Sequence, residues 1–440
     1  YNPEGEIGWI TTEVSGPNIG SGMNDWVESR AHDGTTLYAG GLFTNAGAVT
    51  TKYIAQWNGT AWSSLGAGMG GTSPRVVDME HDGTNLYAGG SFTTAGGVAA
   101  NRVARWNGSS WSALGDGVGA PGYSDLAWDV LLAGGNLYAA GRFTNSGATA
   151  VMNIAMWNGS SWAPLGDGLG LAATIDDSYD VRALAYDGAN LYAGGEFTTS
   201  GGLTVNRVAM WNGTTWTNLG SGLDDEVWAL LHDGTNLYAA GGFHTAGGVT
   251  AHRIAMWNGT SWTNLGSGMD YAVEALAHDG TNLYAGGSFT TAGGVPANLI
   301  AKWNGSTWSA VGSGMTGNMI RSLLFKGKDL YAGGWFTAAG GVPATNIAQW
   351  KTTSTTNEGV NPASGSWTGG YEVVIGGSNL GNGADVTDVT LCGVSATILS
   401  QSATQVVVRA NPASAPGLGD VSVFSTSYGE TVKSNGFTYD

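Results

Sequence analysis

The chain has 440 residues, including 75 glycines and 19 tryptophans, and its 16 basic and 33 acidic residues give a net charge of −17. This charge argues against a protein that follows nucleic-acid phosphates and against docking on anionic lipid. The aromatic content excludes a disordered chain, and no apolar run approaches the roughly 20 residues of a membrane span. We therefore expect a folded protein that has no nucleic-acid partner and does not insert directly into a membrane.

The chain opens with Tyr1, shows no signal peptide and contains a single cysteine, Cys392. We expect a mature product or a piece of a longer chain. No disulfide can form within these residues, so the thiol is either buried and inert or paired with a cysteine outside this segment.

One unit is repeated through the first 350 residues. The tyrosine of its L-Y-A segment recurs seven times, and each time a tryptophan follows 19 residues later. The tyrosines are Tyr38, Tyr87, Tyr138, Tyr192, Tyr238, Tyr284 and Tyr331, and the tryptophans are Trp57, Trp106, Trp157, Trp211, Trp257, Trp303 and Trp350.

Each unit carries four short strand signals, V-x-A-L, L-Y-A-G-G-x-F, I-A-x-W and x-W-x-x-L, with Asp-Gly or Asn-Gly turns between several of them. No segment has sustained helical periodicity. Four-stranded units repeated seven times predict an all-β fold, a seven-bladed β-propeller over residues 1–350.

The two ends of this region complement each other. The seventh unit stops after its third strand, at Trp350, whereas residues 19–23 match the L-G-S-G-M end of a unit. We expect the stretch from Trp9 to Ile19 to supply the missing outer strand, because this closes the ring and removes open sheet edges.

The unit resembles kelch-like propeller repeats in its L-Y-A-G-G strand and later tryptophan. It is more similar to the repeats of Rax2-like and delta-60-type surface proteins, whose pattern appears at residues 283–290 and 300–303. This resemblance implies a cell-surface, wall-associated or polarity role, although a propeller alone does not determine a function.

All length variation between repeats lies in the connection from the outer strand of one blade to the innermost strand of the next. The long connections, Gly70–Arg75, Gly119–Leu126 and Gly170–Asp180, are consecutive and cover one arc of the ring. Growth from 3 to 11 residues costs only about 1 kcal/mol of closure entropy, so the insertions could be neutral. Neutral insertions should also lengthen the other connections, and we therefore interpret the arc as a binding surface. Its candidate ligand-binding residues are Tyr123, Asp125, Trp128, Asp176, Asp177, Tyr179 and Arg182.

One position of the innermost strands also diverges, and it is predicted to lie near the mouth of the channel on the long-loop side. It holds Glu28, Val77, Trp128, Arg182, Trp228, Glu274 and Arg321. Aromatic and charged side chains there could bind a sugar or a peptide, which adds Trp228 and Glu274 to the candidate ligand-binding residues. Ordinary packing between blades is the alternative.

Catalytic chemistry finds little support in the sequence. Four histidines, His32, His81, His232 and His278, share one repeat position that elsewhere holds Leu132, Tyr186 and Phe325, so we interpret it as a packing position. An acidic group at Asp176, Asp177 and Asp180 could hold a cation, but a solvated loop is favoured. We expect no catalytic residues, no metal, no cofactor and no enzymatic activity.

Six W-N-G turns contain glycosylation sequons, each with an asparagine, a glycine and then threonine or serine. The asparagines are Asn58, Asn107, Asn158, Asn212, Asn258 and Asn304. The turn itself also requires Asn-Gly, so occupancy depends on a eukaryotic secretory source.

The repeat ends at a polar linker, residues 351–357, and strand signals separated by turns fill residues 358–440. These predict a small β-sandwich, with strands at 371–375, 389–391, 395–398, 405–408 and 421–424. The segment resembles an IPT/TIG immunoglobulin-like domain, through residues 361–365, 369–370, 375–381, 400–402 and 437–439. Such domains are spacers or binding modules in multidomain extracellular chains.

These observations favour a non-enzymatic module at the cell surface or outside the cell. We expect a structural or adhesion role through interactions with protein or polysaccharide, and assembly with copies of itself or with further domains is open. A lectin-like propeller that binds carbohydrate at the long-loop face is the alternative.

Overall fold

The computed structural model describes residues 9–10, 19, 21–120, 125–170, 180–327, 329–350, 359–362, 364–376, 380, 383–402, 405–426 and 429–440. Two compact units divide at Lys351, one comprising Gly8–Lys351 and the other containing Thr352–Asp440. The regular elements of the described residues are all β-strands, which confirms the predicted all-β class. In this part of the chain we find no helix that is long and apolar enough to cross a membrane.

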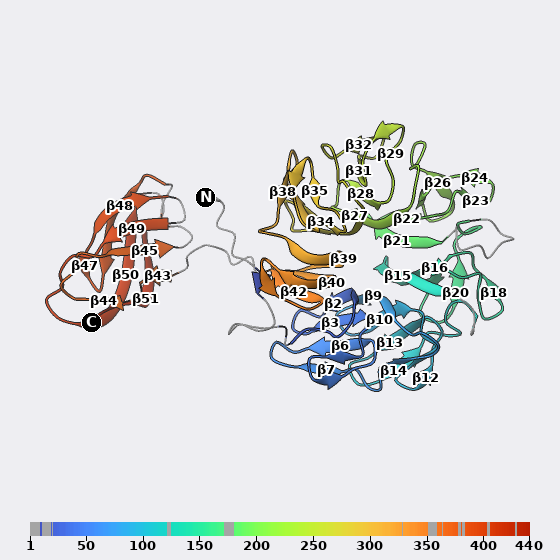
Figure 1. Ribbon diagram of the computed structural model, residues 1–440, viewed down its shortest axis with the longest axis horizontal. Coiled ribbons are helices and arrows are strands. Elements are labelled where there is room, and N and C mark those ends of the chain that lie inside the picture. Colours follow the sequence, from blue (N-terminus) through green and yellow to red (C-terminus); the bar gives the residue numbers. More distant parts are fainter. Residues whose placement is uncertain are drawn as a thin grey trace. The chain divides into compact units, whose positions relative to one another are not determined.

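The repeats form sheets with a common strand order, and in Figure 1 these sheets radiate from a shared centre. Six repeats give a four-stranded sheet, such as β2-β3-β6-β7, and the last gives the five-stranded sheet that contains β39, β40 and β42. The innermost strands are β2 (Val27–His32), β9 (Val76–His81), β15 (Leu126–Ala133), β21 (Val181–Tyr186), β27 (Val227–His232), β33 (Val273–His278) and β39 (Met315–Lys326).

The next two strands of each sheet carry the L-Y-A-G-G and I-A-x-W segments. The second strands are β3 (Leu37–Gly41), β10 (Leu86–Gly90), β16 (Asn136–Arg142), β22 (Leu191–Gly195), β28 (Leu237–Gly241), β34 (Leu283–Gly287) and β40 (Asp329–Ala339). The third strands are β6 (Ile54–Trp57), β13 (Val103–Trp106), β19 (Ile154–Trp157), β25 (Val208–Trp211), β31 (Ile254–Trp257), β37 (Ile300–Trp303) and β42 (Ile347–Trp350).

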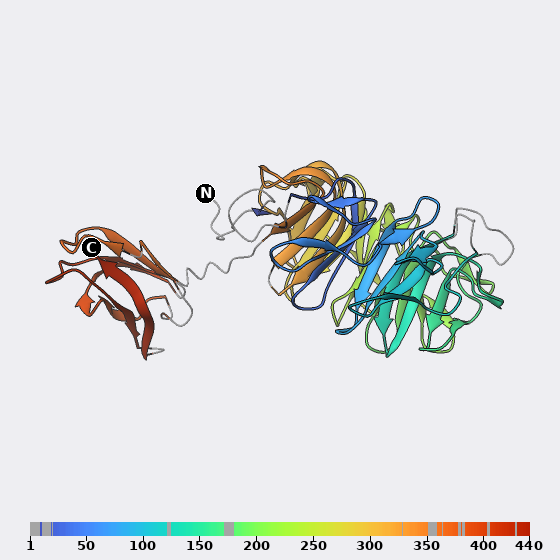
Figure 2. The ribbon, with the colours of Figure 1, turned by 90° about the horizontal axis from the view of Figure 1, so that it is seen from below.

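The outer strands begin at the second tryptophan of each unit. They are β7 (Trp62–Ser64), β14 (Trp111–Ala113), β20 (Trp162–Pro164), β26 (Trp216–Asn218), β32 (Trp262–Asn264) and β38 (Trp308–Ala310). Seen from below, strands of neighbouring sheets lie side by side across the unit (Figure 2). Each innermost strand contacts that of the next sheet, and β39 contacts β2.

The T-A-G-G-V segments connect the second and third strands of each unit, and most of them form two-stranded hairpins with two residues in each strand. These hairpin strands are β4 (Asn45–Ala46), β5 (Val49–Thr50), β11 (Thr94–Ala95), β12 (Val98–Ala99), β17 (Asn145–Ser146), β18 (Thr149–Ala150), β23 (Thr199–Ser200), β24 (Leu203–Thr204), β29 (Thr245–Ala246), β30 (Val249–Thr250), β35 (Thr291–Ala292) and β36 (Val295–Pro296). In addition, β8 (Met69–Gly70) pairs with β11, and β41 (Val342–Pro343) pairs with β40. Paired glycines at the hairpin tips adopt positive φ, as at Gly96 and Gly97, and this conformation suits glycine.

The second glycine of L-Y-A-G-G is required by close approach of the backbone. A Cβ on Gly90 would lie 2.0 Å from the Arg75 carbonyl oxygen, and one on Gly287 would lie 2.1 Å from that of Ala272. The register shifts beside Gly90, so a bulge brings the two strands together there. The repeated glycine is thus a steric requirement of each sheet.

Apolar side chains fill the space between neighbouring sheets. The phenylalanine that follows L-Y-A-G-G is at most 1% exposed in every repeat, as with Phe43 and Phe289. Burial of such a ring contributes about 1.5–3 kcal/mol. The outer-strand tryptophans also tie sheets together, because each indole Nε1 donates to a main-chain carbonyl of the preceding unit, for example Trp111 to Leu65 at 2.9 Å.

The N-terminal segment takes part in the last sheet. The backbone of β1 (Trp9–Ile10) pairs with β42, with Trp9 opposite Trp350, and this register equals that of Trp62 opposite Trp57. Trp62 Nε1 donates to the carbonyl of Ile19 at 2.7 Å, as Trp111 does to Leu65. Residues 11–18 lie outside the described part of the chain.

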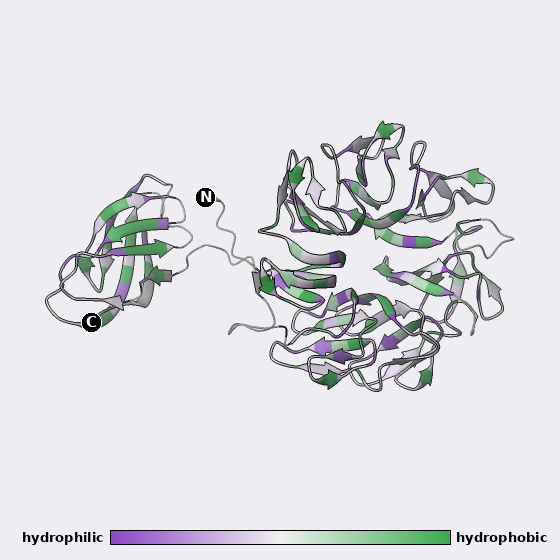
Figure 3. Ribbon diagram, viewed as in Figure 1, coloured by the Kyte–Doolittle hydropathy of each residue, from purple (hydrophilic) through white to green (hydrophobic). Residues whose placement is uncertain are grey.

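The C-terminal unit contains two sheets, and Figure 3 shows hydrophobic residues along many of its strands. One sheet has the order β43-β45-β49-β48 and the other β44-β51-β50-β46-β47. Their bounds are β43 (Gly359–Asn361), β44 (Ser364–Gly365), β45 (Glu372–Gly376), β46 (Val386–Leu391), β47 (Val394–Ser395), β48 (Thr397–Gln401), β49 (Gln405–Arg409), β50 (Gly417–Ser425) and β51 (Gly429–Tyr439). Cys392 is partly buried, and its thiol lies 3.2 Å from the Phe437 carbonyl. Burial raises the pKa of this thiol, which favours the inert form.

Candidate functional site

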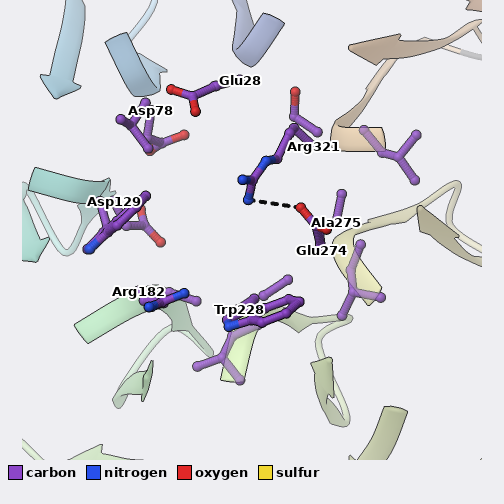
Figure 4. A pocket seen from close by; sticks show the side chains of 16 residues that line it. Glu28, Asp78, Asp129, Arg182, Trp228, Glu274, Ala275 and Arg321 are labelled. Carbon is purple, nitrogen blue, oxygen red and sulfur yellow. Dashed lines mark ion pairs between the residues drawn. The ribbon is translucent and has the colours of Figure 1, made fainter. Parts of the chain in front are cut away.

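The divergent position of the innermost strands lies at one place in the fold. Its seven residues, Glu28, Val77, Trp128, Arg182, Trp228, Glu274 and Arg321, line a single cavity of about 210 Å³, which we call the mouth cavity (Figure 4). The sequence shows only that these residues occupy the same position in each repeat. The structure brings them together.

Trp128 is held between two guanidinium groups. The Arg75 guanidinium lies 5.0 Å from its ring centroid and that of Arg182 lies 5.3 Å away, within the range of cation–π attraction. The indole Nε1 donates to Asp180 at 2.7 Å, and Arg182 Nε donates to the same carboxylate at 3.0 Å. These contacts fix the indole at the rim of the mouth cavity.

Ion pairs continue around the rim. Arg182 also pairs with Glu196 and, at 3.5 Å, with Glu226, whose carboxylate accepts a 2.6 Å hydrogen bond from Trp228. Burial raises the pKa of Glu196 to about 7, although the Arg182 charge opposes the shift. The rim is therefore a network of carboxylates and guanidiniums with indoles between them.

Two further pairs complete this rim. Arg75 Nη1 donates to Glu28 at 3.2 Å, and Arg321 Nη1 lies 2.9 Å from Glu274 Oε2, although that contact lacks hydrogen-bond geometry. Burial raises the pKa of both Glu28 and Glu274, against the opposing charge of nearby guanidiniums.

Two aspartates lie deeper in the channel. Asp78 and Asp129 line both the mouth cavity and a second cavity of about 590 Å³, the inner cavity. Asp78 accepts from Val130 N at 3.0 Å, and Asp129 accepts from Leu184 N at 2.7 Å. The two carboxyl groups also hydrogen-bond to each other, and burial raises the pKa of both.

The predicted binding arc is described only in part. Tyr123, Asp176, Asp177 and Tyr179 lie outside the described residues. Asp125 is 6% exposed, and its carboxylate accepts from Ala120 N at 2.7 Å, so it braces its own loop. The main-chain carbonyl of Asp125 accepts a hydrogen bond from Arg102 Nε. Arg102 is buried and was not among the residues that the sequence singled out. Trp128 and Arg182 are the arc candidates that reach the mouth cavity.

An aromatic pair near this rim was also missed by sequence reasoning. The rings of Trp26 and Trp335 stack with centroids 5.0 Å apart, and Trp335 is 43% exposed. The Arg321 guanidinium lies 6.0 Å from the Trp26 ring, which connects the pair to the mouth cavity. Both tryptophans occupy positions that vary between repeats, and that variation was the available signal.

The four aligned histidines have structural contacts, in agreement with the packing interpretation. His81 stacks on Tyr38 of the preceding repeat, and its Nδ1 accepts from Gly83 N at 3.0 Å. His232 makes the corresponding contacts with Tyr192 and Gly234. A search of the described residues finds no group of three or more His, Cys, Asp or Glu side chains that could hold a metal ion.

The sequon asparagines are exposed, and each serves its own turn. Asn58 Oδ1, for example, accepts from Thr60 N, Thr60 Oγ1 and Ala61 N, each at 2.9 Å. Equivalent bonds recur in the other five turns. These bonds account for the asparagines as turn residues, and glycosylation stays a prediction.

Comparison with known proteins supports part of the sequence assignment. Residues 356–439 match the family model described as IPT/TIG domain, which confirms the resemblance of the C-terminal segment. The solved structure "The beta-propeller domain of the Trilobed protease from Pyrococcus furiosus reveals an open velcro topology" is similar at a TM-score of 0.39 and 10% identity. That match covers 64% of this chain and 80% of the other, and a likeness this slight carries no argument about function. A search of curated proteins gave no match. The chain thus contains an all-β unit of repeated four-stranded sheets and, after it in sequence, a segment that matches the IPT/TIG domain.

Proposed function

We propose that the repeat unit is a closed seven-bladed propeller of the kelch-like or Rax2-like type, completed by the N-terminal strand. Three contacts support this closure. β39 contacts β2, β1 continues the last sheet in the register of the other outer strands, and Trp62 bonds to Ile19 as Trp111 does to Leu65.

We further propose that the chain is a non-enzymatic interaction module at a cell surface or outside the cell, with a structural or adhesion role. One observation carries this proposal. The seven residues that diverge at one repeat position all line the mouth cavity, whereas the L-Y-A-G-G and W-N-G segments are nearly uniform between repeats. Packing between sheets would favour one residue type at that position, and the divergence therefore favours recognition of a ligand.

A lectin-like function is the second candidate, and the exposed stack of Trp26 and Trp335 favours it. Indole faces can pack on sugar rings, and the carboxylates of the rim can accept hydrogen bonds from hydroxyl groups. A protein ligand would use the same indoles and charges, so the ligand class requires an experiment.

The experiment combines a glycan array, capture of proteins from the source surface and metal analysis of the full chain. We expect a selectively retained protein or glycan and no bound transition metal. Trp128→Ala should then weaken binding by more than tenfold, because it removes the indole between Arg75 and Arg182.

The matched control for this test is Trp367→Ala in the C-terminal unit, where the tryptophan is 43% exposed. Its affinity should stay within twofold of the original chain. Unchanged affinity in Trp128→Ala, with an unchanged melting temperature, would contradict binding at the mouth cavity. Bound transition metal with substrate turnover would contradict the non-enzymatic proposal.

A further inference from the structure

The residue that follows the divergent position on each innermost strand divides the channel into two unlike sides. In the order of the sheets it is Ser29, Asp78, Asp129, Ala183, Ala229, Ala275 and Ser322. Four consecutive sheets, counted from the last, therefore present hydroxyl or carboxyl groups, and the remaining three present methyl groups. Figure 4 shows Asp78 and Asp129 across the opening from Ala275.

The polar side has acceptor atoms that the described protein groups leave unused. Glu28 is 6% exposed and lines the mouth cavity, and its Oε2 has no hydrogen-bond partner. The buried Ser322 Oγ also has none. Each oxygen of Asp78 accepts one hydrogen bond, from a backbone N–H and from Ser29 Oγ at 3.3 Å, and a carboxylate oxygen can accept a second. A ligand with several hydrogen-bond donors would satisfy these groups.

The opposite side is apolar. Ala183, Ala229 and Ala275 line it together with Leu230 and Leu276. The mouth cavity of about 210 Å³ is smaller than ligand pockets of roughly 300–1,000 Å³, which suits a slim unbranched chain.

The charged side chains of the cavity walls indicate whether the ligand is a cation or an anion. Four acidic residues, Glu28, Asp78, Asp129 and Glu274, line the mouth cavity with two basic ones, Arg182 and Arg321. Both guanidiniums are already paired with carboxylates. A second anion would face four carboxyl groups and two guanidiniums that are already ion-paired, although Arg321 Nε has no hydrogen-bond partner, whereas a cation would find Glu28 Oε2 and Glu274 Oε2 without hydrogen bonds.

We propose that the mouth cavity binds a lysine side chain presented by a protein partner. Its methylene stem packs against the alanines, its ammonium donates to the carboxyl groups of Asp78 and Asp129 and to Glu28 Oε2, and the rim indoles add cation–π attraction. An amino sugar would bring a ring rather than a slim stem, and the apolar wall therefore favours lysine. This inference rests on the proposed function and names its ligand.

The test is isothermal titration calorimetry of the full chain with two matched probes. Acetyl-trilysine amide carries the ammonium groups, and the same peptide acetylated at each Nζ keeps the shape without the charge. We expect 1:1 binding of the first and at least tenfold weaker binding of the second. The variant with both Asp78→Asn and Asp129→Asn should lose at least tenfold in affinity for acetyl-trilysine amide.

Glu80→Gln is the matched control, because Glu80 lies on the same β9 strand but lines only the inner cavity. Its affinity should stay within twofold. If the double variant does not fold, Ala229→Leu replaces it, since this change fills the apolar side and leaves the carboxyls intact. A tenfold loss in Ala229→Leu supports the proposal, and unchanged affinity overturns it.

Equal binding of the two peptides, no heat with either, or unchanged affinity in a folded double variant would overturn the lysine proposal. If another ligand from the screen still depends on Trp128, only the lysine inference is wrong. If no ligand depends on Trp128, the proposed binding function is wrong as well.

Discussion

Deletion of residues 1–20 is expected to lower the melting temperature by roughly 6 °C or more, or to cause aggregation. The deletion removes the β1 backbone that pairs with β42 and removes Ile19, which is 2% exposed and accepts the Trp62 hydrogen bond. Lost apolar burial, the lost hydrogen bond and the lost ladder sum to about 4 kcal/mol or more. The freed edge of β42 would also be open to pairing with other chains.

The control deletes only residues 1–7 and keeps Trp9 and Ile10. Its melting temperature should match that of the full chain in a calorimetric scan. A normal melting curve after deletion of residues 1–20 would show that the N-terminal segment does not close the last sheet.

Arg30→Leu is expected to stabilise the protein by about 2–4 kcal/mol, because it replaces a buried unpaired charge with an apolar side chain. Arg30 is 5% exposed, and none of its guanidinium nitrogens has a hydrogen-bond partner among the described groups. Burial lowers its pKa to about 9. The other repeats hold apolar residues at this position, namely Met79, Val130, Leu184, Leu230, Leu276 and Leu323.

The side chain of Arg30 lies between the last sheet and the first, since a Cβ on Gly333 would be 2.6 Å from its Nη1. Thermal denaturation should therefore show a rise of roughly 3–6 °C for Arg30→Leu. Leu276→Met at the same repeat position is the control and should change stability by less than about 1.5 kcal/mol. A lower melting temperature for Arg30→Leu would show that the guanidinium is paired in solution.

The features that every repeat shares could be predicted from the sequence. The strand order of each unit follows from turn residues and apolar alternation, and the glycine at 90 or 287 follows from steric contact that every unit shares. The IPT/TIG assignment was also confirmed. The long C-terminal strand β51 was missed because only its last residues carried a recognised pattern.

The site was harder to predict, because it depends on contacts between units. The common level of Glu28, Trp128 and Trp228 could be read from the alignment of repeats, but their ion pairs could not. Asp125 was predicted to contact a ligand, yet its carboxylate accepts a hydrogen bond from the backbone N–H of Ala120. The apolar-to-arginine change at Arg30 is visible in the sequence, but its burial without a hydrogen-bond partner depends on packing between sheets.

The central claim, that the long-loop side of the channel binds the ligand, is tested most directly by shortening one loop. Residues 171–179 are replaced by a single serine, which leaves Gly170 and Asp180 in place, so that Asp180 still accepts from Trp128 and Arg182. The fifth and sixth units already connect with three residues, and the fold should therefore persist. We predict an unchanged melting temperature and more than tenfold weaker binding of the ligand from the screen. A lower melting temperature with unchanged affinity would contradict the account and would mean that the loop serves packing.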